Sequence, residues 1–187
     1  MLARGWLKGK RPFGYTALMT DASLRRFASG DMQWLVARHR DLYAQEAGFD
    51  SSFAAVVSEL LHGFCVNHDP ACERGWLAER DGRRLGSIFC MREDAQTARL
   101  RLFLLTPEAR GQGLGKQLLR SCMGFARAAG YQGMLLKTCQ SHEAAGALYR
   151  AFGWQIQQCR PMRNYGRDLV EQTWSVRFHA PDEGGRV

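Results

Sequence analysis

The sequence predicts a single α/β domain of about seven strands and four helices, and three observations lead to this fold class. Short apolar segments alternate with amphipathic segments along the 187 residues in the order βααβββαβαββ, with no repeat or low-complexity tract. The dipeptide Asp81-Gly82 separates two such segments, a pattern typical of a two-residue hairpin. An apolar segment at 100–105 runs into a glycine-rich turn and then an amphipathic helix.

The first half of the chain is expected to form a strand, two helices and three further strands. Asp31 is the expected N-cap of the first helix, and Asp50 or Ser51 that of the second. The strands are expected at 23–27, 76–80, 84–92 and 97–106.

The second half continues with two helices and three strands. The helix after the glycine-rich turn carries its apolar side chains on one face (Leu118, Leu119, Cys122, Phe125 and Ala126). A strand is expected at 131–138, followed by a helix that Ser141 caps and Gly153 ends. Strands at 155–160 and 169–178 complete the domain.

The glycine-rich turn between the strand and the helix predicts an anion site. Gly111, Gly113 and Gly115 allow the backbone to approach a ligand closely, and the helix N-terminus contributes unpaired N–H groups and partial positive charge. Arg110 and Lys116 add full charges at either side, so the turn is suited to a diphosphate. A Walker A loop would need Ser or Thr after Lys116, and the spacing of the glycines does not fit a dinucleotide-binding loop.

Two motifs resemble those of the GNAT N-acetyltransferases, which bind acetyl-coenzyme A. The string Arg110-x-x-Gly113-x-Gly115 is similar to the pyrophosphate loop of that family, and Leu148-Tyr149-x-x-x-Gly153-Trp154 is similar to its second signature. The resemblance implies a central mixed, mostly antiparallel sheet and acetyl-coenzyme A as cosubstrate. The coenzyme-binding residues that it implies are Leu104, Leu105, Thr106, Arg110, Gly111, Gln112, Gly113, Leu114, Gly115, Lys116 and Ser141.

A narrower resemblance covers residues 22–178. The segments at 42–46, 76–89 and 166–174 are similar to the acetyltransferase half of bacterial proteins that fuse a GNAT domain to a MarR-type DNA-binding domain. No segment is left for the winged-helix half, so DNA binding is not implied.

Composition and charge agree with a cytoplasmic enzyme domain. A hydrophobic content of 45% with 24% charged residues is ordinary for a globular protein, and no signal peptide or membrane-spanning segment is expected. The six cysteines are expected to be thiols. The acetyltransferase domain is expected at 21–180, with a flexible basic extension at 1–20 and a disordered tail at 181–187. Alternatively, the extension results from an upstream start, and Met19 or Met32 is the true initiator.

Half of the net charge of +8 lies in residues 1–11. The remainder suits a phosphate-rich coenzyme, and no basic stripe with interleaved aromatics indicates a nucleic-acid partner. A homodimer is left open.

Tyr149 is the expected general acid for the leaving thiolate of coenzyme A. It matches the tyrosine that the family uses near the coenzyme sulfur, and a phenol with a pKa of about 10 retains its proton at neutral pH. The alternative is a core aromatic. The resemblance implies direct transfer in a ternary complex, with a backbone N–H of Leu104 or Leu105 as oxyanion donor. Cys139 is the nearest candidate for a covalent nucleophile and is not favoured.

The acceptor is expected to be a primary amine, of a small molecule or an amino acid. Arg99 and Arg101 share one strand face and would favour a carboxylate, unless that face is solvated. Glu46 and Arg101 are the candidate substrate contacts, and the segment at 162–165 is expected to overhang the acceptor site. The general base is not identified. Protein or peptide amines, and a non-catalytic acetyl-coenzyme A sensor, remain the alternatives.

One constellation contains possible metal ligands within eleven residues: His62, Cys65, His68 and Cys72. Zinc fingers instead pair their ligands in two short clusters that a longer loop separates. We therefore expect no metal site.

Overall fold

The computed structural model describes residues 22–178, and the predictions for 1–20 and 181–187 lie outside the described residues. The elements in chain order are β1 (Ser23–Arg26), the 3-10 turn η1 (Ser29–Asp31), α1 (Met32–Ala47), α2 (Ser52–Asn67), β2 (Arg74–Arg80), β3 (Arg83–Arg92), β4 (Thr97–Leu105), the 3-10 turn η2 (Pro107–Ala109), α3 (Leu114–Ala128), β5 (Gly133–Cys139), α4 (Glu143–Ala151), β6 (Gln155–Asn164) and β7 (Arg167–Arg177). The predicted element order is confirmed.

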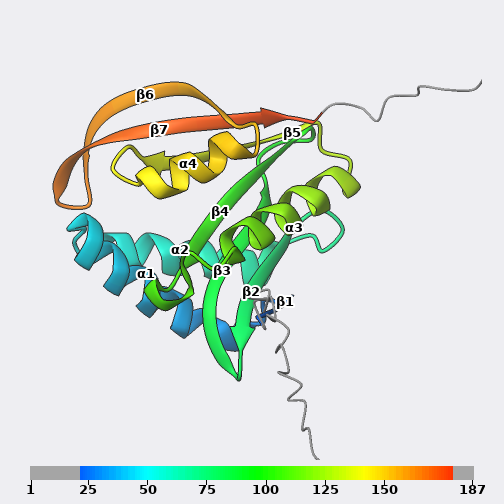
Figure 1. Ribbon diagram of the computed structural model, residues 1–187, viewed down its shortest axis with the longest axis horizontal. Coiled ribbons are helices and arrows are strands. Elements are labelled where there is room, and N and C mark those ends of the chain that lie inside the picture. The colour runs from blue at the N-terminus through cyan, green and yellow to red at the C-terminus, as the bar shows by residue number, and fades with distance from the viewer. Residues whose placement is uncertain (1–21, 179–187) are drawn as a thin grey trace, which may run out of the picture.

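The strands form one seven-stranded sheet in the order β1-β2-β3-β4-β5-β7-β6. Every neighbouring pair is antiparallel except β4 and β5, which are parallel (Figure 1). β4 pairs with β5 only from Thr97 to Arg99, although both strands continue beyond this point. The two strands therefore splay apart in the middle of the sheet. Beyond Arg99, the edge of β4 that faces β5 has no strand partner among the described residues 22–178.

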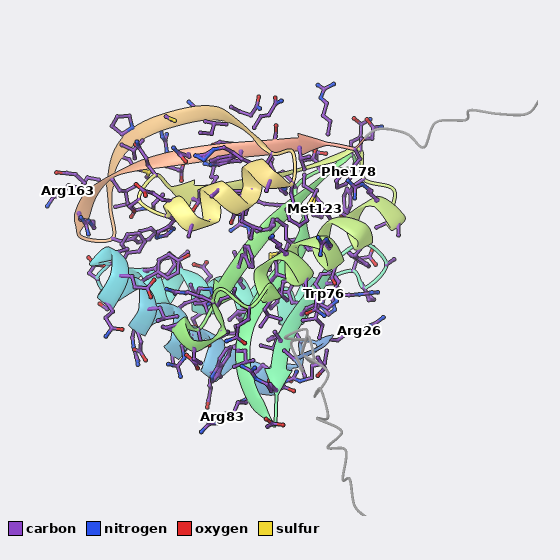
Figure 2. All side chains as sticks on the ribbon, in the orientation of Figure 1. Arg26, Trp76, Arg83, Met123, Arg163 and Phe178 are labelled. Atoms are coloured by element: carbon purple, nitrogen blue, oxygen red, sulfur yellow. The ribbon has the colours of Figure 1, made fainter. Side chains whose placement is uncertain are left out.

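Helices bury both faces of this sheet, with α3 and α4 on one face and α1 and α2 on the other (Figure 1). Alternation along β2 and β3 explains the two cores, because successive side chains point to opposite faces. Trp76 and Ile88 pack in the core that includes Met123 of α3, whereas Leu77 and Phe89 pack against α1 and α2. Figure 2 shows Trp76 and Met123 between α3 and the sheet.

Local sequence explains several turns and caps. Asp81 and Gly82 both have positive φ, 51° and 72°, as a type I′ turn requires, so the predicted hairpin is confirmed. The Asp50 carboxylate accepts a hydrogen bond from the backbone N–H of Ser52 at 2.9 Å and so caps α2. No helix within 22–178 is both long and apolar enough to cross a membrane.

Of two predicted caps, Ser141 is wrong, and Asp31 occupies the N-cap position of α1 without a side-chain bond to that helix. α4 begins at Glu143 with His142 in the N-cap position, so Ser141 lies in the preceding turn with an exposed side chain. Asp31 does not cap α1 with its side chain. Its carboxylate instead accepts hydrogen bonds from Arg25, at 2.7 and 2.8 Å, and from Arg84, at 2.8 Å. Two nearby guanidinium groups offer stronger bonds than a backbone N–H does.

The final hairpin is longer than the sequence pattern indicated. β6 extends through Asn164 and β7 begins at Arg167, so most of the segment at 162–165 is strand, and Tyr165-Gly166 forms the turn. Almost all of β6 is exposed on both faces, so its sequence does not alternate between apolar and polar residues. The end of this strand therefore could not be predicted from hydrophobic periodicity.

Candidate active site

The free edge of β4 presents backbone groups where the sheet splays. The Thr106 N–H donates to the Leu85 carbonyl on the β3 side at 2.9 Å. Backbone N–H and C=O groups alternate in direction along a strand, so those of Leu104, two residues earlier, also point to β3. Leu105 consequently directs its N–H and C=O to the open edge. Of the two residues expected to offer backbone groups to the coenzyme, Leu105 is placed to do so and Leu104 is not.

A β-bulge changes the direction of the same strand. The register between β3 and β4 shifts between Ser87 and Phe89, and Leu102 has a φ of 48°, an uncommon value for a branched residue. The buried Ser87 hydroxyl donates to the Leu102 carbonyl at 2.6 Å and holds the bulge in place. Nothing in the local sequence signals this distortion.

The three glycines of the loop have separate structural reasons. Gly111 and Gly113 have φ values of 74° and 81°, which side-chain-bearing residues rarely adopt, and Gly113 is the N-cap of α3. At Gly115 a Cβ would lie 3.3 Å from the Leu105 side chain and 3.4 Å from that of Leu148. The first two glycines shape the loop, and the third lets α3 pack closely against β4 and α4.

Charged side chains flank this loop. The Arg110 guanidinium donates to the Leu105 carbonyl at 3.1 Å and forms an ion pair with Glu46 at 2.9 Å. Lys116 is exposed, and the Gln112 amide oxygen accepts a bond from Arg80 at 3.2 Å. An anion bound at the loop would therefore compete with Glu46 for Arg110.

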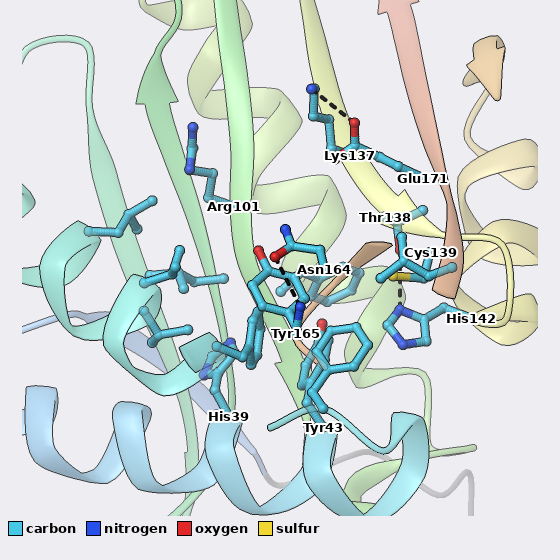
Figure 3. Close-up of a pocket in the computed structure, with 18 of the residues that line it drawn as sticks. His39, Tyr43, Arg101, Lys137, Thr138, Cys139, His142, Asn164, Tyr165 and Glu171 are labelled. Atoms are coloured by element: carbon cyan, nitrogen blue, oxygen red, sulfur yellow. Dashed lines mark hydrogen bonds and ion pairs between the residues drawn. The ribbon is translucent and has the colours of Figure 1, made fainter. Parts of the chain in front are cut away.

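A cavity of about 240 Å³ adjoins the splay. It is lined by residues of α1, α2, β4, β5, α4, β6, β7 and the β6–β7 turn, and Met162, Asn164 and Tyr165 of the segment at 162–165 are among them (Figure 3). An aromatic group forms much of its wall, namely Tyr43, Phe49, Phe53 and Tyr165, with ring-centroid separations of 4.4 to 5.4 Å between contacting pairs. The cavity thus combines an apolar wall with the charged side chains described next.

The charged groups of the cavity come from three strands. Arg99 pairs with Glu93 at 2.9 Å, and Lys137 pairs with Glu171 at 3.0 Å. Arg101 also lines the cavity and has no ion-pair partner within 22–178. Burial lowers the pKa of Arg101, because a charge held away from water without a counterion has a higher free energy.

Tyr149 lines the cavity from α4 and is also a core residue. It is buried at 4% exposure and lies between Phe103, Trp154 and Trp174, with ring-centroid separations of 5.8 to 6.3 Å. Burial raises the pKa of its phenol well above the usual value, so the hydroxyl retains its proton. The structure therefore fits both a core aromatic and a proton donor.

The surroundings of three other residues from the sequence analysis, Glu46, Cys139 and Thr106, give less support for a role in the site. Glu46 does not line the cavity and lies instead beside the loop, with Arg110. Cys139 lines the cavity, and burial raises the pKa of its thiol, which makes it a poor nucleophile. Thr106 is buried, and its hydroxyl has no hydrogen-bond partner within 22–178.

Sequence reasoning missed two histidines of the cavity, His39 and His142. His39 lies on α1 one turn before Tyr43, a spacing that places both on one helix face, and this is the only signal the sequence held for it. His142 follows the predicted cap Ser141, and no pattern marked it.

No group of three or more possible metal ligands is found within residues 22–178. His62, Cys65 and His68 lie on or just after α2. His68 bonds the Phe64 carbonyl at 2.8 Å, and Cys72 contacts the Arg92 guanidinium at 2.7 Å.

Comparisons with known proteins agree with this geometry. The model of the acetyltransferase (GNAT) family matches residues 32–154. Human N-acetyltransferase 8B is 35% identical over 118 residues, or 60% of this chain and 52% of the relative. Rat N-acetyltransferase 8F1 is 34% identical over 111 residues, or 57% and 50%. The chain thus spans about half the length of the curated relatives it matches.

Solved structures share the fold. A ribosomal-protein-alanine N-acetyltransferase from Brucella melitensis has a TM-score of 0.69 at 19% identity, covering 83% of this chain and 99% of that one. A GNAT acetyltransferase from Elizabethkingia anophelis with acetyl-CoA bound has a TM-score of 0.61 at 16% identity, covering 86% and 100%. The predicted fold is confirmed, and the narrower resemblance to MarR fusion proteins stays a prediction.

Proposed function

Since this chain belongs to the acetyltransferase (GNAT) family, we propose that it is an acetyl-coenzyme A-dependent N-acetyltransferase acting on a small primary amine that carries a carboxylate. The proposal rests mainly on Arg101, which has no ion-pair partner among residues 22–178 and lines an aromatic-walled cavity at the splay between β4 and β5.

The glycine loop holds the coenzyme diphosphate. Backbone N–H groups from Gly111 to Gly115 and the α3 N-terminus supply the donors, and Lys116 adds charge. Arg110 exchanges Glu46 for phosphate. The free edge of β4 at Leu105 then receives the pantetheine amides as a strand partner would, which directs the thioester toward Tyr149 and the cavity.

Acetyl transfer follows from this placement. The neutral amine attacks the acetyl carbon, a backbone N–H at the β4 edge stabilises the oxyanion by about 3 kcal/mol, and the Tyr149 hydroxyl protonates the leaving sulfur. The raised pKa of Tyr149 keeps that proton available. The raised pKa of Cys139 supports direct transfer to the amine over an acyl-enzyme.

The cavity supports a small acceptor with two recognisable parts. A carboxylate compensates the Arg101 charge, and an apolar group packs on the wall formed by Tyr43, Phe49, Phe53 and Tyr165. A volume of about 240 Å³, with α2 and the β6–β7 turn among the walls, favours a small molecule over an extended polypeptide.

Matched acceptor pairs test this proposal. Acetylation of free phenylalanine is compared with that of phenethylamine, which lacks only the carboxylate, in the wild type, Arg101→Gln and the control Arg83→Gln. Arg83 is exposed at the tip of the β2–β3 hairpin (Figure 2). We expect the wild type and the control to prefer phenylalanine. Arg101→Gln should lose about 10- to 100-fold in kcat/KM for phenylalanine alone, the usual effect of a charge-assisted bond. Equal use of both amines, or preference for a peptide amine, would contradict the substrate class.

A further inference from the structure

The cavity contains an imidazole for which the family motifs give no role. His142 lies at the N-cap of α4, seven residues before Tyr149, so the two side chains lie two helical turns apart on one face and both line the cavity. On the basis of the proposed function, we propose that His142 is the general base that accepts the proton of the acceptor amine.

Contacts from two elements fix the imidazole. Its Nδ1 lies 3.3 Å from the Thr138 hydroxyl oxygen on β5, and its ring stands edge-on to Tyr43 of α1 at a centroid separation of 5.2 Å. Figure 3 shows His142 beside Tyr43, with the contact to Thr138 dashed. When Nδ1–H donates to Thr138, the lone pair at Nε2 is free, and Nε2 has no hydrogen bond within 22–178. A base must have such a free, oriented nitrogen.

The surroundings keep this imidazole neutral. Burial lowers its pKa below the usual 6.5, Arg110 lowers it further, and Glu46 opposes this. The N-terminus of α4 also disfavours a cation. The other titratable or charged groups that line the same cavity come from the helices, the sheet and the β6–β7 hairpin: His39, Tyr43, Arg99, Arg101, Lys137, Cys139, Tyr149, Tyr165 and Glu171. A neutral imidazole at pH 7 is the form that accepts a proton.

The proton balance closes with His142 and Tyr149 as a pair. The amine lone pair forms the C–N bond to the acetyl carbon, and Nε2 takes one N–H proton from the tetrahedral adduct. The C–S bond then breaks, and sulfur takes the proton of Tyr149. His142 releases its proton to solvent, Tyr149 regains one, and the products are the acetamide and free coenzyme A.

The other candidate bases fit less well. Glu171 is paired with Lys137 at 3.0 Å, and Glu46 does not line the cavity. His39 is buried at 2% exposure with Nε2 unpartnered within 22–178, and burial lowers its pKa to about 4. The His39 ring stacks on Tyr43 and contacts Phe53 of α2. His142, in contrast, is the N-cap residue of α4, the helix that carries Tyr149.

The test is the pH dependence of kcat, from pH 5 to 9, with both substrates saturating. The variants are His142→Gln, His142→Asn, which keeps a good N-cap residue, and His39→Gln, with His62→Gln as a control on the exposed side of α2. In the wild type and the control, kcat should fall on an acidic limb with a midpoint below 6.5. In both His142 variants that limb should disappear, kcat should be about 100-fold lower, and the KM for acetyl-coenzyme A should change less than about 2-fold. Added imidazole should restore part of the lost rate.

Two results would overturn the assignment. One is a wild-type pH profile in both folded His142 variants, with folding checked by thermal melting. The other is loss of the acidic limb in His39→Gln alone. A wild type that transfers acetyl to no amine would contradict the proposed function itself, so the two failures are distinguishable.

Discussion

The glycine-rich loop, proposed to bind the coenzyme, and the cavity, proposed to bind the acceptor, are built by different means. The loop is one contiguous segment, Arg110–Lys116, and most of its residues are exposed. Its predicted donors are backbone N–H groups whose positions depend on two glycines with positive φ. The cavity is lined by side chains from seven helices and strands that lie far apart in the chain. Short local patterns therefore reveal the first region, whereas the second appears only once the chain is folded.

This difference predicts that changes in the two regions affect different kinetic constants. Loop substitutions should alter coenzyme binding, and cavity substitutions should alter turnover or acceptor binding. The following changes test that separation, from the largest effect to the smallest.

Tyr149→Phe removes a hydroxyl and leaves the ring that packs against Trp154 and Trp174. We expect kcat to fall by about 10²- to 10⁴-fold, the usual range for a general acid, with little change in the KM for acetyl-coenzyme A. Steady-state kinetics at saturating amine measure both constants. Unchanged turnover would leave Tyr149 as a core aromatic only.

Asp31→Asn changes neither region and separates stability from function. The carboxylate is 2% exposed between Arg25 and Arg84, whose side chains are about one-third exposed (35% and 34%). We expect the free energy of unfolding to fall by about 3 kcal/mol, at the lower end for a broken buried ion pair. Urea denaturation measures this, and the KM for acetyl-coenzyme A should stay within about 2-fold of the wild-type value.

The same carboxylate predicts a pH dependence of stability. The hydrogen bonds from Arg25, followed by those from Ala28 and Arg84, hold the pKa of Asp31 well below its usual range. Its contribution is therefore complete above the unfolded pKa of about 3.9 and is lost as the pH falls below that value. Urea midpoints measured from pH 7 to 3 should decline less steeply in Asp31→Asn than in the wild type. Parallel declines would contradict this.

Gly113→Ala tests the loop alone. A Cβ there meets no atom within 4 Å, but the φ of 81° costs a side-chain-bearing residue about 1–2 kcal/mol. The KM for acetyl-coenzyme A should rise about 5- to 30-fold while kcat at saturation changes little. Gly124→Ala in the middle of α3, which also has open space, is the matched control and should leave the KM unchanged.

Glu46→Gln should have the smallest effect and the opposite sign. It frees Arg110 from an ion pair whose side chains are 46% and 43% exposed. Exposed pairs contribute at most about 1 kcal/mol, so the Kd for acetyl-coenzyme A should fall by less than about 5-fold. Titration calorimetry with acetyl-coenzyme A measures this change. Weaker binding would show that Glu46 positions Arg110 for the coenzyme.

Much of the fold followed from the sequence because its signals are local. Asp81-Gly82 specified a turn type, and the glycines after Arg110 specified a left-handed backbone. Asp31 occupies the predicted N-cap position of α1, but two guanidinium groups, one of them from β3, engage its carboxylate, and no local pattern contains these contacts.

The site was predicted less completely for the same reason. Tyr149 and the loop lie in contiguous motifs, but the aromatic wall joins α1, α2 and the β6–β7 turn, and the bulge at Leu102 depends on Ser87 in the neighbouring strand. His142 acquires its surroundings only in the folded chain, where Tyr43 of α1 lies edge-on to its ring.

The most direct test of the central claim is chromatographic detection of coenzyme A released from acetyl-coenzyme A. The panel comprises amino acids, polyamines, aminoglycosides and peptides, with Tyr149→Phe run alongside. We predict release that requires an amine, is fastest with apolar amino acids, and is lost in the variant. Tight binding of acetyl-coenzyme A without release for any amine would contradict the account and identify a sensor.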